Sequence, residues 1–173
     1  MIRFWLLLVA ACALVGAAAA QETVIEKEVR RLDIPKSLTP TGKQPLFMVR
    51  AEGFQIYKAD AKLEWTFQSP EATLLDYRTG EDVGTHSKGP AWIDSKGSKL
   101  TGRVIGNKPA PNPQAIPWLL VEVKNENGGQ YAKVTHIQRV DTWAGLKPTA
   151  APTKVDESIK VRYQATYVFW GDR

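Results

Sequence analysis

The sequence predicts an all-β protein, a single antiparallel β-sandwich or barrel-like domain that follows an N-terminal arm or short helix. Three observations predict it. Apolar and polar residues alternate with a period of two along most of the chain after residue 45. Turn-forming residues separate about eight or nine short runs of this kind. Neither a long internal repeat nor a shift in composition divides the chain, so we expect one β-domain over residues 46–173.

The first 20 residues have the pattern of a secretory signal peptide. Arg3 precedes an unbroken run of apolar and small residues over 4–20, and Ala18-Ala19-Ala20 matches an A-x-A cleavage site. The run is shorter than the ~20 residues that a membrane-spanning helix needs. We therefore expect cleavage near Ala20 and a periplasmic or secreted protein whose mature chain does not insert into a membrane. A lipoprotein anchored through Cys12 is the alternative.

Composition limits what the mature protein can be. Cys12 is the only cysteine, so cleavage near Ala20 leaves no disulfide, no thiol nucleophile and no thiolate metal site. Without Arg3, 22 of the 23 basic residues remain against 18 acidic ones, a net charge of +4. The basic residues alternate with acidic ones instead of gathering on one face. That distribution does not fit a nucleic-acid-binding protein.

Residues 21–45 are expected to form an arm or linker that leads into the β-domain. Ile25, Val29 and Leu32 recur at the spacing of a short amphipathic helix, which Pro35 would end. An extended arm along the sheet is the alternative. The turn-rich segment "TPTGKQP" (39–45) completes the linker.

The strands can be followed along the chain. A hairpin is expected at "SKGS" (95–98) and another at "ENGG" (126–129), where Asn127-Gly128 is the strongest two-residue turn signal. Trp65 and Trp118 lie in apolar strand patterns and are expected in the core. The expected strand runs are "LFMVRAEGFQIYK" (46–58, parted at Glu52-Gly53), "KLEWTFQ" (62–68), "ATLLDY" (72–77, after a Ser-Pro break), "AWID" (91–94), "KLTGRVIG" (99–106), "PWLLVEVKN" (117–125), "GQYAKVTHIQRV" (129–140) and "VRYQATYVF" (161–169).

Two long irregular connections interrupt the strands. The first, "NKPAPNPQAIP" (107–117), contains four prolines, which make its backbone stiff and extended. The second, "GLKPTAAPTKVDES" (145–158), is equally long and polar. Connections of this length in a compact domain are usually functional or disordered. The first is therefore a candidate rim of a binding groove, and a plain crossover between strands is the alternative.

Candidate ligand-binding residues lie where strands meet loops. Trp92 and Trp143 occupy such junctions, where a partly exposed indole suits stacking on a sugar or another ring. Histidine and arginine side chains in the same strands add polar groups. The alternative is that Trp92 fills one end of the core and His86 is a satisfied polar residue at a strand end. The candidate set is His86, Trp92, His136, Arg139 and Trp143.

Templates for catalysis are absent from the sequence. It contains no G-x-S-x-G elbow, no Gly-Lys phosphate loop and no H-E-x-x-H pair, and we expect no metal, no cofactor and no catalytic residues. The expected function is a non-catalytic binding module for an envelope polysaccharide or a small extracellular ligand. One alternative is an extracytoplasmic hydrolase that uses His86 with a nearby carboxylate. The other is a purely structural or interaction domain, and the sequence leaves the oligomeric state open.

Several segments in a fixed order point to a family. The chain resembles a secreted family of bacterial and fungal proteins known only as a domain of unknown function, DUF3455, from about Leu32 to Trp170. The resemblance implies export and a single β-rich domain, and it implies no catalytic residues. It is carried by "FQIYK", "WTFQSPEATLLD", "VGTHSKGPAW", "GSKLTGRV", "AIPWLLVEV", "VTHIQRVDT" and "YQATYVFW".

Overall fold

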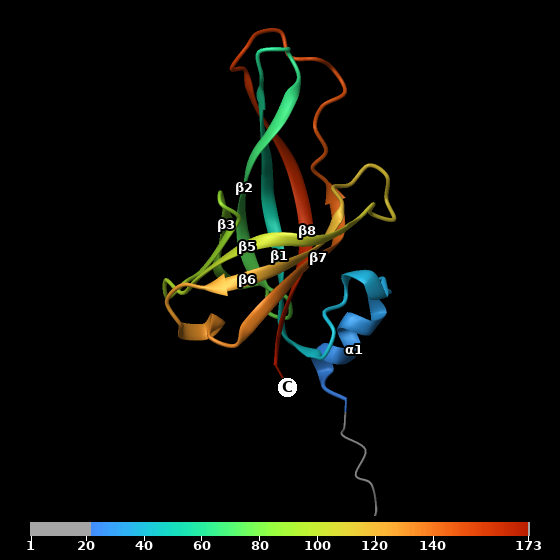
Figure 1. The fold of residues 1–173 in the computed structure, drawn as a ribbon, viewed down its shortest axis with the longest axis vertical. Helices are drawn as coiled ribbons and strands as arrows, with labels where there is room; N and C mark the ends of the chain where they lie inside the picture. Colours follow the sequence, from blue (N-terminus) through green and yellow to red (C-terminus); the bar gives the residue numbers. More distant parts are fainter. Residues whose placement is uncertain (1–21, 173) are drawn as a thin grey trace, which may run out of the picture.

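A computed structural model describes residues 22–172, in which eight antiparallel strands close into a barrel (Figure 1). Each strand pairs with the next along the chain, and the last strand pairs with the first. The predicted all-β fold is confirmed in its barrel form. The signal peptide over 1–20 and Cys12 lie outside the described residues. The elements are α1 (Val24–Arg31), η1 (Lys36–Leu38), β1 (Lys43–Ala59), β2 (Trp65–Asp76), β3 (Asp82–Ser87), β4 (Ala91–Asp94), β5 (Lys99–Lys108), β6 (Trp118–Asn125), η2 (Gly129–Tyr131), β7 (Val134–Ala144) and β8 (Ser158–Asp172).

The N-terminal segment contains the short helix that the apolar spacing predicts. Thr23 begins α1 with a capping box: its hydroxyl accepts from the Glu26 backbone N–H (3.2 Å), and the Glu26 carboxylate accepts from the Thr23 N–H (2.8 Å). The apolar face of α1, with Ile25 and Val29, packs on the outside of the barrel (Figure 1). Within residues 22–172, no helix combines the length and the apolar character needed to cross a bilayer.

The strands β1 and β2 are longer than the sequence predicts. The breaks expected at Glu52-Gly53 and at Ser69-Pro70 are wrong, because both positions lie inside continuous strands. Gly53 permits the close approach of β2, since a Cβ atom there would overlap the backbone of Glu71 and Ala72. Pro70 is tolerated because pairing of β2 with β3 begins only at Ala72, so one side of the strand has no partner at the proline.

Both predicted hairpins are formed, but the loop of the second is longer than expected. The turn at 95–98 joins β4 to β5, and the Asp94 carboxylate accepts from the N–H groups of Lys96 (2.9 Å) and Ser98 (2.7 Å). The expected two-residue turn at Asn127-Gly128 is instead part of a longer connection that contains η2. Its Tyr131 ring is buried, and it extends the aromatic stack of Phe47 and Phe169 inside the barrel. Burial of this ring draws the chain inward, and β7 therefore starts only at Val134.

Three apolar clusters stabilise the barrel. The largest fills its interior, and the second lies between the outer surface of the barrel and the N-terminal segment, where Trp118 and Leu38 are buried. The third contains Tyr57 and Trp65 at the far end, where β1, β2 and β8 extend beyond the other strands (Figure 1). The predicted core positions of Trp65 and Trp118 are confirmed, with 8 % and 7 % of their surface exposed.

The two long connections lie against each other and against the barrel. Ala115 and Gly145 form an isolated bridge, and the Ile116 N–H donates to the Ala144 carbonyl (2.9 Å). The Tyr57 hydroxyl donates to the Gly145 carbonyl (2.7 Å). These bonds fix the position of Pro117, the last residue of the first connection.

Candidate functional site

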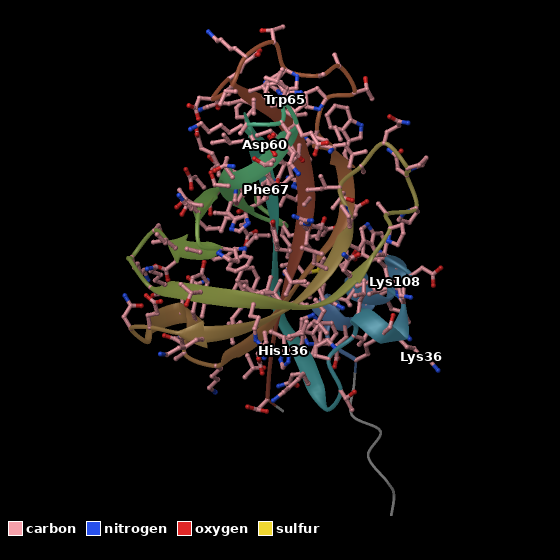
Figure 2. The ribbon with its side chains drawn as sticks, turned by 45° about the horizontal axis from the view of Figure 1, so that its top comes forward. Lys36, Asp60, Trp65, Phe67, Lys108 and His136 are labelled. Carbon is pink, nitrogen blue, oxygen red and sulfur yellow. The ribbon has the colours of Figure 1, made fainter. Side chains whose placement is uncertain are left out.

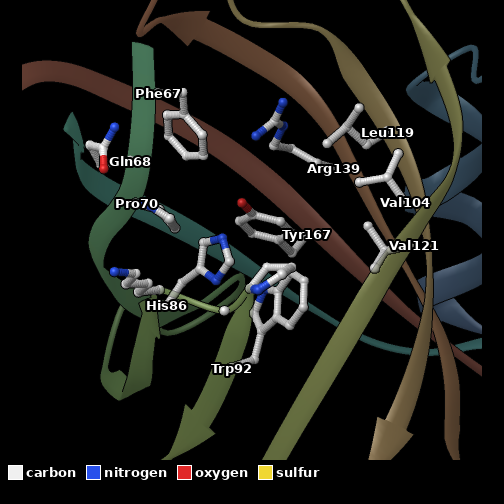
Figure 3. Close-up of a pocket in the computed structure, with 13 residues that line it drawn as sticks. Phe67, Gln68, Pro70, His86, Trp92, Val104, Leu119, Val121, Arg139 and Tyr167 are labelled. Carbon is white, nitrogen blue, oxygen red and sulfur yellow. The ribbon is translucent and has the colours of Figure 1, made fainter. Parts of the chain in front are cut away.

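The barrel wall is short on one side, and a cavity of about 400 Å³ lies there. The strands β3 and β4 contain 6 and 4 residues, whereas β2 and β5 on either side contain 12 and 10. Where β3 and β4 end, side chains from the taller strands surround an opening into the barrel interior (Figure 3). The residues that line it are Phe67, Gln68, Pro70, His86, Lys88, Gly89, Pro90, Trp92, Val104, Leu119, Val121, Arg139 and Tyr167.

An aromatic cluster forms the floor of the cavity. His86 and Trp92 are register partners on β3 and β4, and their rings stack with centroids 4.4 Å apart and planes 13° apart. The Tyr167 ring of β8 meets both edge-on, 5.2 Å from His86 and 5.9 Å from Trp92. Only 4 % of His86 and 2 % of Trp92 are exposed. The tight turn at Gly89-Pro90 holds the two short strands together, so the stack follows directly from the local sequence.

The protonation of His86 follows from its surroundings. Its Nδ1 lies 2.9 Å from the Ala91 carbonyl oxygen, which can only accept, so Nδ1 carries the proton and Nε2 carries the lone pair. Burial lowers the pKa of His86 to about 4, against the opposing effect of the Ala91 hydrogen bond, and the charge of Arg139 lowers it further. The ring is therefore neutral at pH 7, with a hydrogen-bond acceptor at Nε2.

Arg139 brings a positive charge to the other side of the cavity. Its Nε and Nη2 donate to the Pro117 carbonyl, at 3.1 and 2.9 Å, which holds the side chain in place. Among residues 22–172, no carboxylate forms an ion pair with this guanidinium. Figure 3 shows the guanidinium above the Tyr167 hydroxyl and beside the Phe67 ring. Burial raises the pKa of Tyr167, and the charge of Arg139 opposes that rise.

Two polar atoms of the floor are buried without a hydrogen bond of good geometry. They are the Trp92 Nε1 and the Tyr167 hydroxyl, although the Tyr163 hydroxyl and the Arg139 guanidinium lie close enough to the Tyr167 hydroxyl to affect its pKa. Buried polar groups in proteins are nearly always hydrogen-bonded, so an unpaired pair at a cavity needs an explanation. The rest of the lining is largely aliphatic or aromatic. The cavity thus combines an apolar wall with a few polar atoms, the usual composition of a small-molecule site.

The structure brings three of the five predicted site residues together and leaves two apart. His86, Trp92 and Arg139 line the same cavity. His136 does not line it. Its Nδ1 lies 3.0 Å from the Thr135 hydroxyl, and Figure 2 shows it near the end of the barrel opposite Phe67.

Trp143 is likewise outside the lining, with 54 % of its surface exposed. A β-bulge between Val140 and Trp143, with Asp141 at φ 47°, shifts the alternation of β7 and turns the indole away from the interior.

Other cavity residues carry no obvious signal in the sequence. In the sequence, nothing distinguishes Phe67, Val104 and Leu119 from other strand residues. They lie at one opening only because of the register of the barrel strands. The connection over 107–117, expected as a rim, contributes no lining residue. Its role is indirect, because its Pro117 carbonyl fixes Arg139. Within residues 22–172, no group of three or more His, Cys, Asp or Glu side chains is arranged to hold a metal ion.

Comparison with known proteins places the chain in a family. A search of curated proteins and a search of solved structures gave no match. A family model described as "Protein of unknown function (DUF3455)" matches residues 40–171, from just before β1 to within one residue of the end of β8. This agrees with the resemblance carried by the sequence segments. The chain therefore belongs to the DUF3455 family.

Proposed function

We propose that the protein is a non-catalytic binding module that holds a small, mainly apolar molecule in the cavity beside β3 and β4. The observation that carries the proposal is the lateral opening, whose apolar walls surround a few convergent polar atoms. Its volume of about 400 Å³ lies within the ~300–1,000 Å³ of typical small-molecule sites. The lining residues come from seven strands and the β3–β4 turn, so the site is built into the barrel itself.

The geometry favours a small ligand over an envelope polysaccharide. A sugar-binding tryptophan must offer one face of its indole, and the Trp92 ring is enclosed by His86 and Tyr167 with 2 % of its surface exposed. At the opening, Phe67 is 52 % exposed and offers an accessible ring. The apolar contacts that a ligand could make therefore lie inside the cavity and at its rim, within reach of a small molecule.

The lining also favours binding over hydrolysis. The residues that surround the cavity include no serine, threonine or cysteine and no carboxylate that could orient His86. The His86 Nδ1 donates to a backbone carbonyl, and a pKa of about 4 makes the ring a weak general base at neutral pH. Export belongs to the same proposal and rests on the signal-peptide pattern over residues 1–20, so the ligand would be met in the envelope or outside the cell.

A neutral fluorescent probe tests the proposal. N-phenylnaphthylamine brightens in apolar sites, and we expect saturable, one-to-one binding. Val104 lines the opening and is half exposed, so Val104→Trp should block the cavity without disturbing the fold and weaken binding at least about tenfold. The neighbouring Ile105 is equally exposed but does not line the cavity, and Ile105→Trp should leave binding unchanged. Absence of binding to the wild type, or equal binding by both variants, would contradict the proposal.

A further inference from the structure

We infer that the cavity selects organic anions, molecules with an apolar body and one carboxylate or sulfonate group that pairs with Arg139. This inference rests on the proposed function, because it assigns a ligand class to the same cavity. It depends on three observations: the bonding capacity that Arg139 retains, the sign of the charges around the opening, and the polar atoms of the floor.

Arg139 has bonding capacity that the described residues do not use. A guanidinium offers five N–H donors, and the Pro117 carbonyl occupies two of them. The other three donors have the Tyr167 hydroxyl beside them, and no described carboxylate forms an ion pair with the group. The residue is more buried than exposed, so its charge is not fully solvated. A planar anion such as a carboxylate matches the geometry of the free donors and would supply the missing counter-charge.

The charged residues at the cavity are all basic. Lys88 lines it from the β3–β4 turn and Arg139 from β7, and the lining contains no Asp or Glu. Within residues 22–172, Lys88 also forms no ion pair. Two unpaired cations around a largely apolar opening create a positive potential, which attracts anions and raises their rate of association. The chain as a whole has a modest net charge of +5, so this concentration of charge is local.

The polar atoms of the floor set the orientation of the ligand. The Tyr167 hydroxyl lies below the Arg139 guanidinium and close enough to interact with it, so the two can donate to one anionic group (Figure 3). The His86 Nε2 carries a lone pair, which repels an anion and accepts from an N–H or O–H group. The anionic end therefore belongs at Arg139, and the apolar body against Leu119 and Val121.

A pair of matched probes tests the inference. Anilinonaphthalene sulfonate and N-phenylnaphthylamine share one skeleton and differ by the sulfonate. We expect the anion to bind at least about tenfold more tightly at low salt, and the preference to shrink as salt rises. Arg139→Gln keeps an N–H donor for the Pro117 carbonyl and removes the charge, so it should abolish the preference. Arg139→Lys should retain part of it.

Controls separate this inference from the proposed function. Arg103 lies on β5 outside the cavity and pairs with Glu122 at 2.5 Å, and Arg103→Gln should leave the anion preference unchanged. Val104→Trp should weaken binding of both probes. Circular dichroism of each variant confirms the fold. Equal affinities for the two probes, or a preference that survives Arg139→Gln, would overturn the anion assignment while the cavity proposal stands. Binding of neither probe would overturn both.

Discussion

Two walls of the same barrel differ sharply in construction. The strands β1, β2 and β8 contain 17, 12 and 15 residues, and β1 pairs with β8 from Lys43 opposite Asp172 to Lys58 opposite Ser158. The strands β3 and β4 contain 6 and 4 residues. The long wall, formed by β1, β2 and β8, is held together by extensive backbone pairing. The short wall, formed by β3 and β4, has few backbone pairs and is stabilised by the buried His86–Trp92 stack. The comparison teaches that the cavity lies where side-chain packing replaces backbone hydrogen bonding in the barrel wall.

The largest expected effect comes from a clash in each wall. A Cβ atom at Gly53 would overlap the Glu71 carbonyl oxygen of the neighbouring strand, and one at Gly84 would overlap that of Ile93. We expect Gly53→Ala to cost more than ~4 kcal/mol, enough to unfold a marginal domain, because β1 must separate from β2 in the long wall. Gly84→Ala also strains a φ of 152°, but the two short strands can separate locally, so we expect a smaller cost of ~1–3 kcal/mol together with loss of probe binding.

Urea unfolding followed by circular dichroism measures both variants. Equal losses of stability would show that the two walls contribute alike, and the comparison drawn above would fail. Retention of probe binding in a folded Gly84→Ala protein would show that the cavity does not depend on the short wall.

The next prediction compares the stability effects of replacing Trp92 and Trp143, which both lie at strand–loop junctions in the sequence. Trp92 is fully enclosed in the short wall, and Trp92→Ala should cost ~3–5 kcal/mol through loss of burial and creation of a void. Trp143 is 54 % exposed, and Trp143→Ala should change stability by less than ~0.5 kcal/mol and leave probe binding intact. Chemical denaturation of both variants at pH 7 provides the test. A large effect at Trp143 would reveal a role for that indole which its exposure does not suggest.

A smaller effect concerns the acid stability of the short wall. The pKa of His86 is about 4 in the folded protein against 6.5 for the free side chain. Between these values the unfolded chain binds a proton that the folded protein does not, so the free energy of unfolding decreases as pH falls from about 6.5 to 4. The total decrease is about 3 kcal/mol, at 1.36 kcal/mol for each pH unit.

Substitution of the histidine removes this acid dependence. His86→Gln should show a flatter stability profile between pH 6.5 and 4 than the wild type. His136→Gln is the matched control, because His136 is more exposed and its pKa is lowered less severely by burial. We expect the control to keep most of the wild-type slope. A wild-type slope in His86→Gln would mean that other groups cause the acid sensitivity.

Much of the fold is predictable from local patterns. The alternation of β8, the turn at 95–98 and the apolar spacing of α1 all predict the observed structure, because each depends on residues close in sequence. The hairpin predicted around 126–129 is formed by β6 and β7, but its loop is longer than two residues and includes η2, where Tyr131 is buried. The breaks predicted in β1 and β2 are wrong because Gly53 and Pro70 are accommodated by their neighbours, which a single sequence does not reveal.

The site is predictable only in part. His86 and Trp92 are register partners joined by a short turn, so their proximity follows from the sequence. Arg139 lies on β7, far from both residues in sequence, and lines the same cavity. Two bulges interrupt the alternation of that strand, one between Val134 and His136 and one between Val140 and Trp143. Whether a side chain of β7 points into or out of the barrel therefore depends on bulges that the sequence does not reveal.

Because β3 is short, part of β2 has backbone N–H and C=O groups on one side that pair with no strand of the described chain. From Trp65 to Glu71 the strand has β1 as its only neighbour. An unpaired strand edge of this kind can pair with a strand of a second molecule and lead to aggregation. Pro70 lies within this stretch and has no N–H to offer to an incoming chain. We therefore expect the proline that the barrel tolerates there to disfavour edge-to-edge pairing of two molecules.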